Sequence, residues 1–426
     1  MKAKTSQLWE KIKENRHMLV ALALTFIAAT VYYFAWAIPQ TYADSTHIGF
    51  ETGRIDNNMW WASDARDYRD TGDNLFGNTE EETVLYRRPW LYPFIVGALR
   101  QFTPFDPDYS LWAVQFIMWL ATAGFTLGAV FRATKKMGWA ILATGLFWTH
   151  PSIIALTFHG MTEALNTFLV AFFAFVVLKP RDANEKWAEN KNYWLIFLMS
   201  LLLVTKPTYQ VQLAILLLYV LAISFKKWRV LRFWGKIALA LIPLWIQLLL
   251  SWQILGSPII SDVAGPTLKY WTVTRVYAKV EDTTATLPEI AAIVEDWSRE
   301  EEIAYLLNNK KATFSVYFNN LVEEGLLADS YVIIKKDNAM NRAIMTLNQW
   351  HFYLHTLMLP LMGYVLLLGD KRKWEVIWII YLTFLIQTLA SGVSSDQGDR
   401  LIITAMPLWI VAYVTVFNAQ GMEVSK

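Results

Sequence analysis

The sequence predicts an all-α polytopic membrane protein with about ten transmembrane helices. Hydrophobic residues make up 55% of the chain and charged residues only 17%, whereas soluble domains average about 25% charged residues. The 21 tryptophans suit helices that are anchored at the level of the lipid headgroups. Apolar runs recur along the chain, and several approach the roughly 20 residues that a span needs. The absence of cysteine excludes disulfides, thiolate nucleophiles and Cys-ligated zinc.

We expect one membrane-spanning helix in each of ten apolar runs. The first run follows a basic segment and lacks the small residues of a cleavage site, so it predicts an uncleaved span. Residues 193–224 are read as two short spans that turn at Lys206-Pro207, and residues 90–102 as an interfacial helix. The ten runs are 18–38, 110–131, 138–157, 162–178, 193–205, 208–224, 237–255, 349–368, 376–390 and 401–418.

The charges decide the sidedness of these spans, because cytoplasmic loops are enriched in Lys and Arg. With the N-terminus inside, the inside segments hold 21 of the 38 basic residues and 8 of the 36 acidic residues. The remaining segments are therefore strongly acidic. This distribution predicts an integral membrane protein with both termini in the cytoplasm. We expect its membrane to be the bacterial inner membrane.

Two outward regions are large, and we expect them to belong to a single membrane domain that covers residues 1–426. The first, residues 39–109, holds most of the polar motifs. The second, about 256–347, is acidic and predicted to be helical, with amphipathic stretches near 287–307 and 313–327. We expect this second region to control the entry of the molecules on which the protein acts.

An acid lies just after the first span. Residues 60–75 suit a short helix on the membrane surface, in which Trp60, Asp64, Asp67/Tyr68 and Leu75 share one face. Asp64 is then placed between apolar anchors and faces a cavity on the membrane side. The alternative is that Ser63 or Asp64 simply caps the helix, since both residue types are good N-caps.

Paired arginines precede the interfacial helix. Pro89 can begin a helix at its first turn and so directs Arg87 and Arg88 toward the interface, ahead of Tyr92. Two guanidinium groups can bind a phosphate bidentately. Anchoring to lipid headgroups is the alternative.

Three further outward positions carry polar groups. His159 and Glu163 are four residues apart and could bind a divalent metal, although two ligands are few and Glu163 also suits the helix dipole. Lys206 sits in an outward turn between two short helices. Arg400 begins the last span, where the helix dipole disfavours a cation; a bound phosphate, or a salt bridge to Asp396 or Asp399, explains it.

Five segments, in this order, make the chain similar to the GT-C superfamily of integral-membrane glycosyltransferases, and most of all to its protein-mannosyltransferase and lipid A aminoarabinose-transferase branch. Each segment is short and degenerate, and the order and the side of the membrane add weight. The segments are SDARDY (63–68), RRPWLYP (87–93), HGMTEALNTFLVAFF (159–173), LLLVTKPTYQ (201–210) and GDRLIITAMPLW (398–409). The resemblance covers most of the chain except 256–347.

The resemblance implies roles for particular residues. Asp64 matches the catalytic acid of the family, and Arg88 stands where the family has a cation that contacts the donor phosphate. Relatives often carry a second acid near the proline, but here Arg87 occupies the adjacent position and the nearest acids are Glu80, Glu81 and Glu82. Larger relatives have a soluble domain after the last span; this chain is expected to recognise its acceptor with its loops.

The chemistry of the residues agrees with a lipid-linked donor. Nucleotide sugars are absent outside the cell, and the chain has no Gly-rich phosphate loop. A phosphate leaving group needs cations rather than a general acid, and one carboxylate base suffices to deprotonate an acceptor hydroxyl. We therefore expect inverting transfer from a polyprenyl-phosphate sugar to a glycan, lipid or protein, with Asp64 as base and Arg88, Arg87, Lys206 and Arg400 at the phosphate.

Two other functions stay open. A flippase or transporter for lipid-linked oligosaccharides would favour charged or broken helices at mid-membrane and a repeat between halves. An O-antigen polymerase or ligase would use loop arginines without the acid after the first span. No nucleic-acid partner and no certain cofactor are expected, apart from a possible divalent metal ion.

Overall fold

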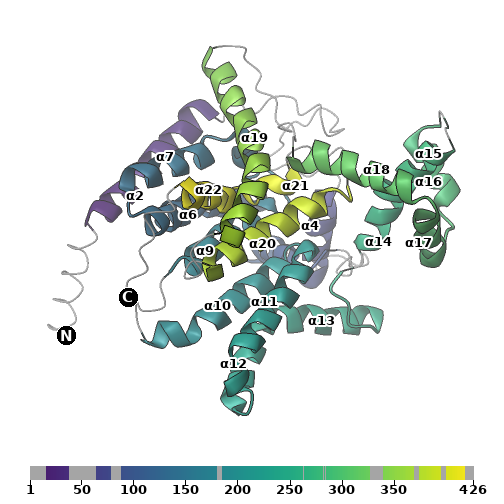
Figure 1. Ribbon diagram of the computed structural model, residues 1–426, viewed down its shortest axis with the longest axis horizontal. Coiled ribbons are helices and arrows are strands. Elements are labelled where there is room, and N and C mark those ends of the chain that lie inside the picture. The colour runs from purple at the N-terminus through teal and green to yellow at the C-terminus, as the bar shows by residue number, and fades with distance from the viewer. Residues whose placement is uncertain are drawn as a thin grey trace.

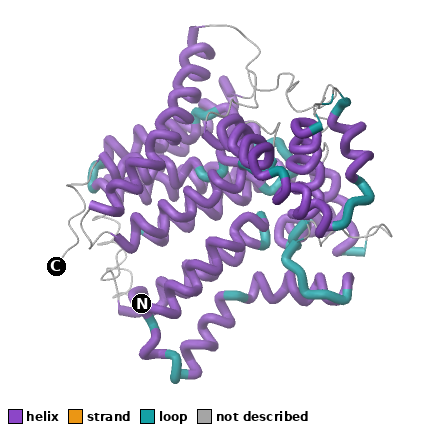
Figure 2. Tube along the Cα trace, turned by 45° about the vertical axis from the view of Figure 1, so that its right-hand side comes forward, coloured by secondary structure: helices purple, strands orange, loops and turns teal. Residues whose placement is uncertain are grey.

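The structure is a computed structural model. It describes residues 16–37, 64–77, 88–179, 185–261, 263–281, 283, 285–326, 339–368, 374–394 and 400–417. Within these residues every element is a helix (Figure 2), so the predicted all-α class is confirmed for the described part of the chain.

The N-terminal half supplies the helices around which the others pack. Helix α6 is the longest of them and contacts α2, α7, α9 and α22 (Figure 1). The interface is buried and apolar, with Leu127 and Val130 of α6 packed in one core with Phe173. These elements are α2 (Arg16–Tyr32), the π-helical turn η1 (Tyr33–Ala37), α4 (Asp64–Leu75), α5 (Leu91–Phe102), α6 (Pro107–Thr134), α7 (Met137–Trp148), α8 (Pro151–Ala155) and α9 (Glu163–Val177).

The middle of the chain adds helices that turn sharply at prolines. Helix α10 ends at Leu203 and the next helical turn begins at Pro207, so the predicted turn at Lys206-Pro207 is confirmed. The elements are α10 (Glu185–Leu203), η5 (Pro207–Tyr209), α11 (Gln210–Ile223), η6 (Phe225–Lys227), α12 (Leu231–Ala240) and α13 (Ile242–Leu255).

An arm of short helices, α14 to η8, projects from the bundle at the right of Figure 1. It falls in the second outward region, and its helical character is as predicted. Its elements are α14 (Ala264–Thr267), η7 (Leu268–Val273), α15 (Thr274–Val280), α16 (Leu287–Val294), α17 (Arg299–Asn308), α18 (Lys310–Asn320) and η8 (Leu321–Leu326). The chain then returns to the bundle through α19 (Ala339–Leu368), α20 (Trp374–Ser391), α21 (Arg400–Ile403) and α22 (Met406–Phe417).

The expected ten spans are not confirmed as single long helices. In the described residues, two helices are long and apolar enough to cross a membrane, Arg16–Ala35 and Pro107–Thr134, and a third if the bent pair α12–α13 counts as one. These helices mark the chain as an integral membrane protein. Several other predicted spans coincide with apolar helices that are shorter than a full crossing: Met137–Trp148, Glu163–Val177, Pro207–Ile223 and Trp378–Ser391.

Prolines and caps account for some of the differences. Proline removes a backbone donor and clashes with the preceding turn, and the run 138–157 breaks where Pro151 begins α8. Helices α12 and α13 bend by 65° just before Pro243. The run 287–307 is split because Ser298 begins a new helix with a capping box to Glu301. Hydropathy does not register such breaks.

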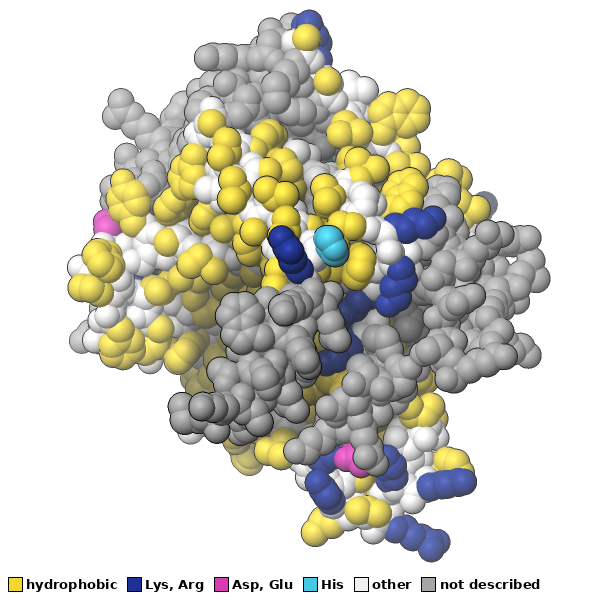
Figure 3. All heavy atoms as spheres, turned by 90° about the vertical axis from the view of Figure 1, so that its left-hand side faces the viewer, with side chains coloured by type: hydrophobic (Ala, Val, Ile, Leu, Met, Phe, Trp, Pro, Cys, Tyr) yellow, Lys and Arg dark blue, Asp and Glu magenta, His cyan; other side chains and the backbone are white. Residues whose placement is uncertain are grey.

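Apolar side chains make up much of the described surface. On the face drawn in Figure 3, hydrophobic side chains cover much of the described area, and Lys and Arg side chains lie across its middle and at its lower end. Apolar residues of α2 such as Leu24 and Ile27 are more than half exposed. A surface of this kind fits contact with lipid rather than with water.

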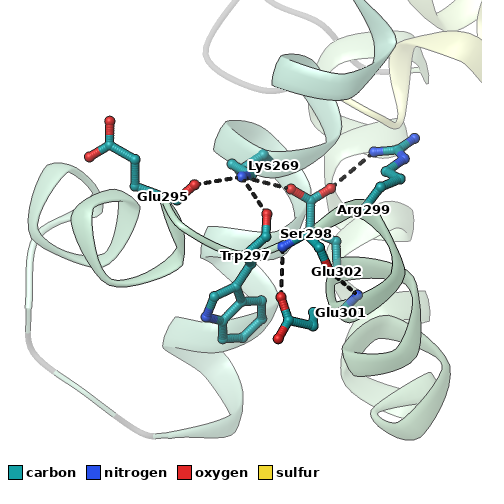
Figure 4. Close-up of polar contacts among 7 residues, drawn as sticks. All are labelled: Lys269, Glu295, Trp297, Ser298, Arg299, Glu301 and Glu302. Atoms are coloured by element: carbon teal, nitrogen blue, oxygen red, sulfur yellow. Dashed lines mark hydrogen bonds and ion pairs between the residues drawn. The ribbon is translucent and has the colours of Figure 1, made fainter.

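The arm is held together by an ion cluster around the buried carboxylate of Glu302 (Figure 4). The carboxylate of Glu302 is 3% exposed and lies 3.1 Å from both Lys269 Nζ and Arg299 Nη1. Lys269 also donates to the backbone carbonyls of Glu295 and Trp297, each at 2.8 Å. Because every donor of the lysine has an acceptor, the cluster fixes η7 against the turn between α16 and α17.

Candidate functional site

The two motifs of the first outward region meet through an ion pair. Asp67 of α4 accepts hydrogen bonds from Arg88 at its Oδ2 atom, at 3.2 Å from Nε and 3.0 Å from Nη2. The side chain of Arg88 is 13% exposed and that of Asp67 38%. Asp67 thus neutralises a partly buried guanidinium and fixes its direction.

Close helix packing makes this pairing possible. A Cβ built on Gly97 of α5 would lie 2.3 Å from the backbone oxygen of Gly72 on α4, and one built on Gly72 would lie 2.6 Å from the oxygen of Pro93. Only glycine fits at both positions, so α4 and α5 are in backbone contact. Arg100 and Asp73 add a second ion pair between the two helices at 2.7 Å.

Aromatic rings line the ion pair. The guanidinium carbon of Arg88 lies 5.2 Å from the centre of the Tyr68 ring, within cation–π range. Tyr68 in turn packs edge-on against Tyr92, with ring centres 5.3 Å apart. Both tyrosines are buried. The predicted candidates Asp67, Tyr68, Arg88 and Tyr92 therefore form one group.

A glutamine that the sequence prediction missed connects this group to residues 156–162 between α8 and α9, which we call the His159 turn. Gln115 of α6 accepts a hydrogen bond from the Tyr92 hydroxyl at 3.1 Å. Its amide donates to the carbonyls of Thr157 at 3.1 Å and of His159 at 3.0 Å. Gln115 is 1% exposed, so it lies fully inside the protein and holds α5, α6 and the turn together. A polar side chain inside an apolar run was the available signal.

Glu163 lies near the same group. It is the first residue of α9 and is buried, as is His159. Burial raises the pKa of the Tyr92 hydroxyl, and the negative charge of Glu163 raises it further. Tyr92 therefore stays protonated and serves as a hydrogen-bond donor. Predicted candidates from the first outward region and from the His159 turn therefore lie around Tyr92.

The remaining predicted cations lie at other element ends. Lys206 precedes η5 and is half buried. Arg400 is the first residue of α21, which contacts α8 beside the His159 turn; its side chain, like that of Asp64, lies outside the described part of the structure. Asp64 is the first residue of α4, three positions before Asp67. Arg87, Ser63 and Glu80 to Glu82 lie outside the described residues, as do Asp396 and Asp399.

The described residues contain no group of three or more His, Cys, Asp or Glu side chains that could hold a metal ion. His159 and Glu163 thus stand as a pair at most. Two cavities inside the bundle, of about 20 and 10 Å³, are lined largely by apolar side chains and include none of the predicted site residues. Each is about the size of one water.

Comparisons with known proteins complete the description. No protein-family model matches the chain, and no curated protein is similar to it in sequence. Among solved structures, the chain is similar to ArnT from Cupriavidus metallidurans bound to undecaprenyl phosphate, at 11% identity and a TM-score of 0.38 over 94% of this chain and 77% of that one. The apo state of the same protein gives 11% identity and a TM-score of 0.35 over the same shares. A likeness this distant carries no argument, and the proposals below rest on the chain's own residues.

Proposed function

We propose that this chain is a membrane glycosyltransferase that moves a sugar from a polyprenyl-phosphate donor to an acceptor hydroxyl on the extracytoplasmic side. One observation carries the proposal. The acid-bearing segment after the first apolar helix and the arginine-proline motif, 21 residues apart, meet in the Asp67–Arg88 ion pair. Arg88 lies just before α5 and is oriented by Asp67. A cation held in this way can bind the phosphate of a lipid-linked sugar.

The chemistry follows from the charges. Asp64 takes the proton of the acceptor hydroxyl as the hydroxyl oxygen attacks the anomeric carbon of the sugar. The bond between that carbon and the phosphate oxygen breaks, and the phosphate leaves with the electron pair. The negative charge that develops there is stabilised by Arg88, aided by Arg87, Lys206 and Arg400. Attack opposite the leaving group inverts the anomeric configuration.

Asp67 is assigned a positioning role in this reaction. Its carboxylate holds Arg88 on the side of Tyr68, and the phosphate takes the remaining donors of the guanidinium fork. Tyr92, Gln115 and the His159 turn hold the helix that follows Arg88 in place. Asp67 thereby fills the place near the proline that the sequence left without a second acid.

The test uses the purified full chain in lipid nanodiscs with a panel of polyprenyl-phosphate hexoses and pentoses. The measured product is the released polyprenyl phosphate, in the presence of glycan, lipid or peptide acceptors. We expect release with at least one donor, and its loss in Asp64→Asn with an unchanged melting temperature. Asp70→Asn on the same helix is the matched control and keeps full activity. Release that persists undiminished in Asp64→Asn contradicts the assignment.

A further inference from the structure

Helix α18 exposes two large aromatic side chains. Phe314 is 68% exposed and Phe318 is 49% exposed, and their rings stack at 6.0 Å with an interplanar angle of 19°. On the neighbouring helix α17, Ile303 and Leu307 are exposed as well. Apolar area of this kind is unfavourable in water at about 25 cal/mol per Å², so the surface has the character of a contact site.

The exposed rings occupy one side of the helix. At about 100° per residue, Lys310, Phe314, Phe318 and Lys311 fall within one arc of the helical circumference. Val316 and Asn320, which are buried, fall on the opposite side. Helix α18 contains two lysines and no acid. Its exposed side therefore carries a phenylalanine pair flanked by two lysines, and aromatic rings beside lysine stems suit the level of the lipid headgroups.

Hydrogen bonds place α18 at the end of an apolar helix. The Tyr317 hydroxyl donates to the carbonyl of Leu389 at 2.7 Å, and the Asn320 amide donates to that of Gly392 at 3.4 Å. The Thr272 hydroxyl adds a contact to the carbonyl of Val393 at 3.3 Å. Leu389 lies in the last turn of α20, and Gly392 and Val393 follow directly after its end at Ser391. Side chains of the arm donate to their carbonyls, so α18 sits at the level where α20 leaves the apolar bundle.

The next segment fastens the arm from a second side. His355 of α19 hydrogen-bonds through Nε2 to the carbonyl of Gly325 in η8 at 2.8 Å. The Thr356 hydroxyl bonds to the carbonyl of Leu326. A Cβ on Gly325 would lie 2.2 Å from Ser391 Oγ, so η8 touches the end of α20 directly. The position of α18 relative to α19 and α20 is therefore fixed by both neighbours.

We propose that the α18 aromatic face, Lys310, Lys311, Phe314 and Phe318, is an interfacial anchor that lies in the surface of the lipid bilayer. The two rings enter the acyl region of the leaflet beside the end of α20, and the lysine ammonium groups meet lipid phosphates. The arm projects from the bundle in Figure 1, which lets it rest on surrounding lipid. This assignment is independent of the reaction that the chain catalyses.

The absence of cysteine makes a direct test possible. Single cysteines at Phe314, Phe318 and Asn319 are spin-labelled in the full chain, in nanodiscs of phosphatidylethanolamine and phosphatidylglycerol. Collision with oxygen, which concentrates in lipid, is compared with collision with a water-soluble nickel chelate. Asn319 is the matched control, because it is exposed on the same helix but outside the arc of the rings.

We expect the ratio of oxygen to nickel accessibility at 314 and 318 to be several-fold higher than at 319. Nickel-dominated collision at all three positions overturns the anchor. Dipolar broadening between labels of two molecules also overturns it, because the face is then an interface between copies. A second measurement uses the unaltered chain, in which a lipid with a photoreactive acyl chain should label α18. Labelling that spares α18 while it marks the exposed face of α2 contradicts the proposal.

Discussion

Tyr92 and Gln115 form a buried hydrogen bond of 3.1 Å that joins the first outward region to the core of the bundle. The two residues lie on α5 and α6, and each is about 1% exposed. Because Gln115 also uses its amide on the carbonyls of Thr157 and His159, its side chain joins α6 to both α5 and the turn between α8 and α9. The geometry around Arg88 depends on this side chain although it is not itself charged.

Replacing Gln115 by leucine should destabilise the protein strongly. The Tyr92 hydroxyl and two backbone carbonyls lose their partner, and each orphaned buried group costs about 1–3 kcal/mol. Thermal unfolding in detergent measures the loss. Thr126→Val on the same helix is the control, because the Thr126 hydroxyl is buried without a hydrogen-bond partner in the described residues and its removal should be neutral or stabilising. Equal stability of the two variants refutes the role of Gln115.

Adding a methyl group to Gly97 should separate α4 from α5. The new Cβ would lie 2.3 Å from the Gly72 oxygen, and backbone cannot move aside as a flexible side chain can. We expect Gly97→Ala to lower the melting temperature and to weaken the Asp67–Arg88 pair. Gly145→Ala in α7 has nothing within 4 Å of its Cβ and should stabilise by up to about 1 kcal/mol. A gain of stability at both positions is the contrary result.

Removing the carboxylate of Glu302 should loosen the arm. Lys269 keeps its two backbone acceptors and Arg299 is 45% exposed, so the expected loss is that of charge-assisted hydrogen bonds, about 1.5–3 kcal/mol. Glu302→Gln is therefore expected to increase hydrogen exchange throughout η7 and α17. Glu300→Gln, on the same helical turn but exposed, should change stability by less than about 0.5 kcal/mol. Unchanged exchange in Glu302→Gln would falsify the role of the cluster shown in Figure 4.

Low pH should destabilise the N-terminal turn of α17. Hydrogen bonds from the backbone and side chain of Ser298 lower the pKa of Glu301 below its ordinary value of 4.5. A depressed carboxyl pKa contributes stability that is complete above the unfolded value and is lost as the pH falls through the folded value. The difference in melting temperature between the wild type and Glu301→Gln should thus be constant from pH 7 to about 5 and shrink below about 4.5. A difference in melting temperature that grows as the pH falls contradicts this prediction.

Neutralising Asp67 should affect donor binding more than stability. Hydrogen bonds to charged groups contribute about 1.5–3 kcal/mol, so Asp67→Asn, which releases Arg88 from its partner, is expected to raise the KM for the donor by roughly 10- to 100-fold. Arg69 and Asp70 form a more exposed pair on the same helix, and Asp70→Asn should leave KM unchanged. An altered kcat with an unaltered KM points to a different role for Asp67.

Hydropathy and charge predicted the helices well where a helix is long and uniform. The run 110–131 lies inside the observed α6, and the turn at Lys206-Pro207 is in place, because proline determines the local geometry. The breaks at Pro151 and before Pro243 divide runs that read as continuous. Helices shortened in this way fall below the length of a full crossing, which is why the number of spans does not follow from the apolar runs alone.

The candidate site was predictable residue by residue but not as pairs. Asp67, Tyr68, Arg88 and Tyr92 were all candidates. Charged side chains are energetically costly beside a membrane, so their presence there indicates a functional site. That Asp67 is the acid that faces Arg88 depends on the backbone contact between Gly72 and Gly97, which no local pattern reveals. Gln115 was missed because a lone glutamine in an apolar run gives no indication of its partners.

The central claim is that this chain transfers a sugar from a polyprenyl phosphate with Asp64 as the base. The most direct measurement is single-turnover release of polyprenyl phosphate from a donor already bound to the chain in nanodiscs, for the wild type and for Asp64→Asn. The account predicts that both proteins bind the donor equally and that only the wild type releases polyprenyl phosphate when an acceptor is added. Release at the same rate from both proteins contradicts it.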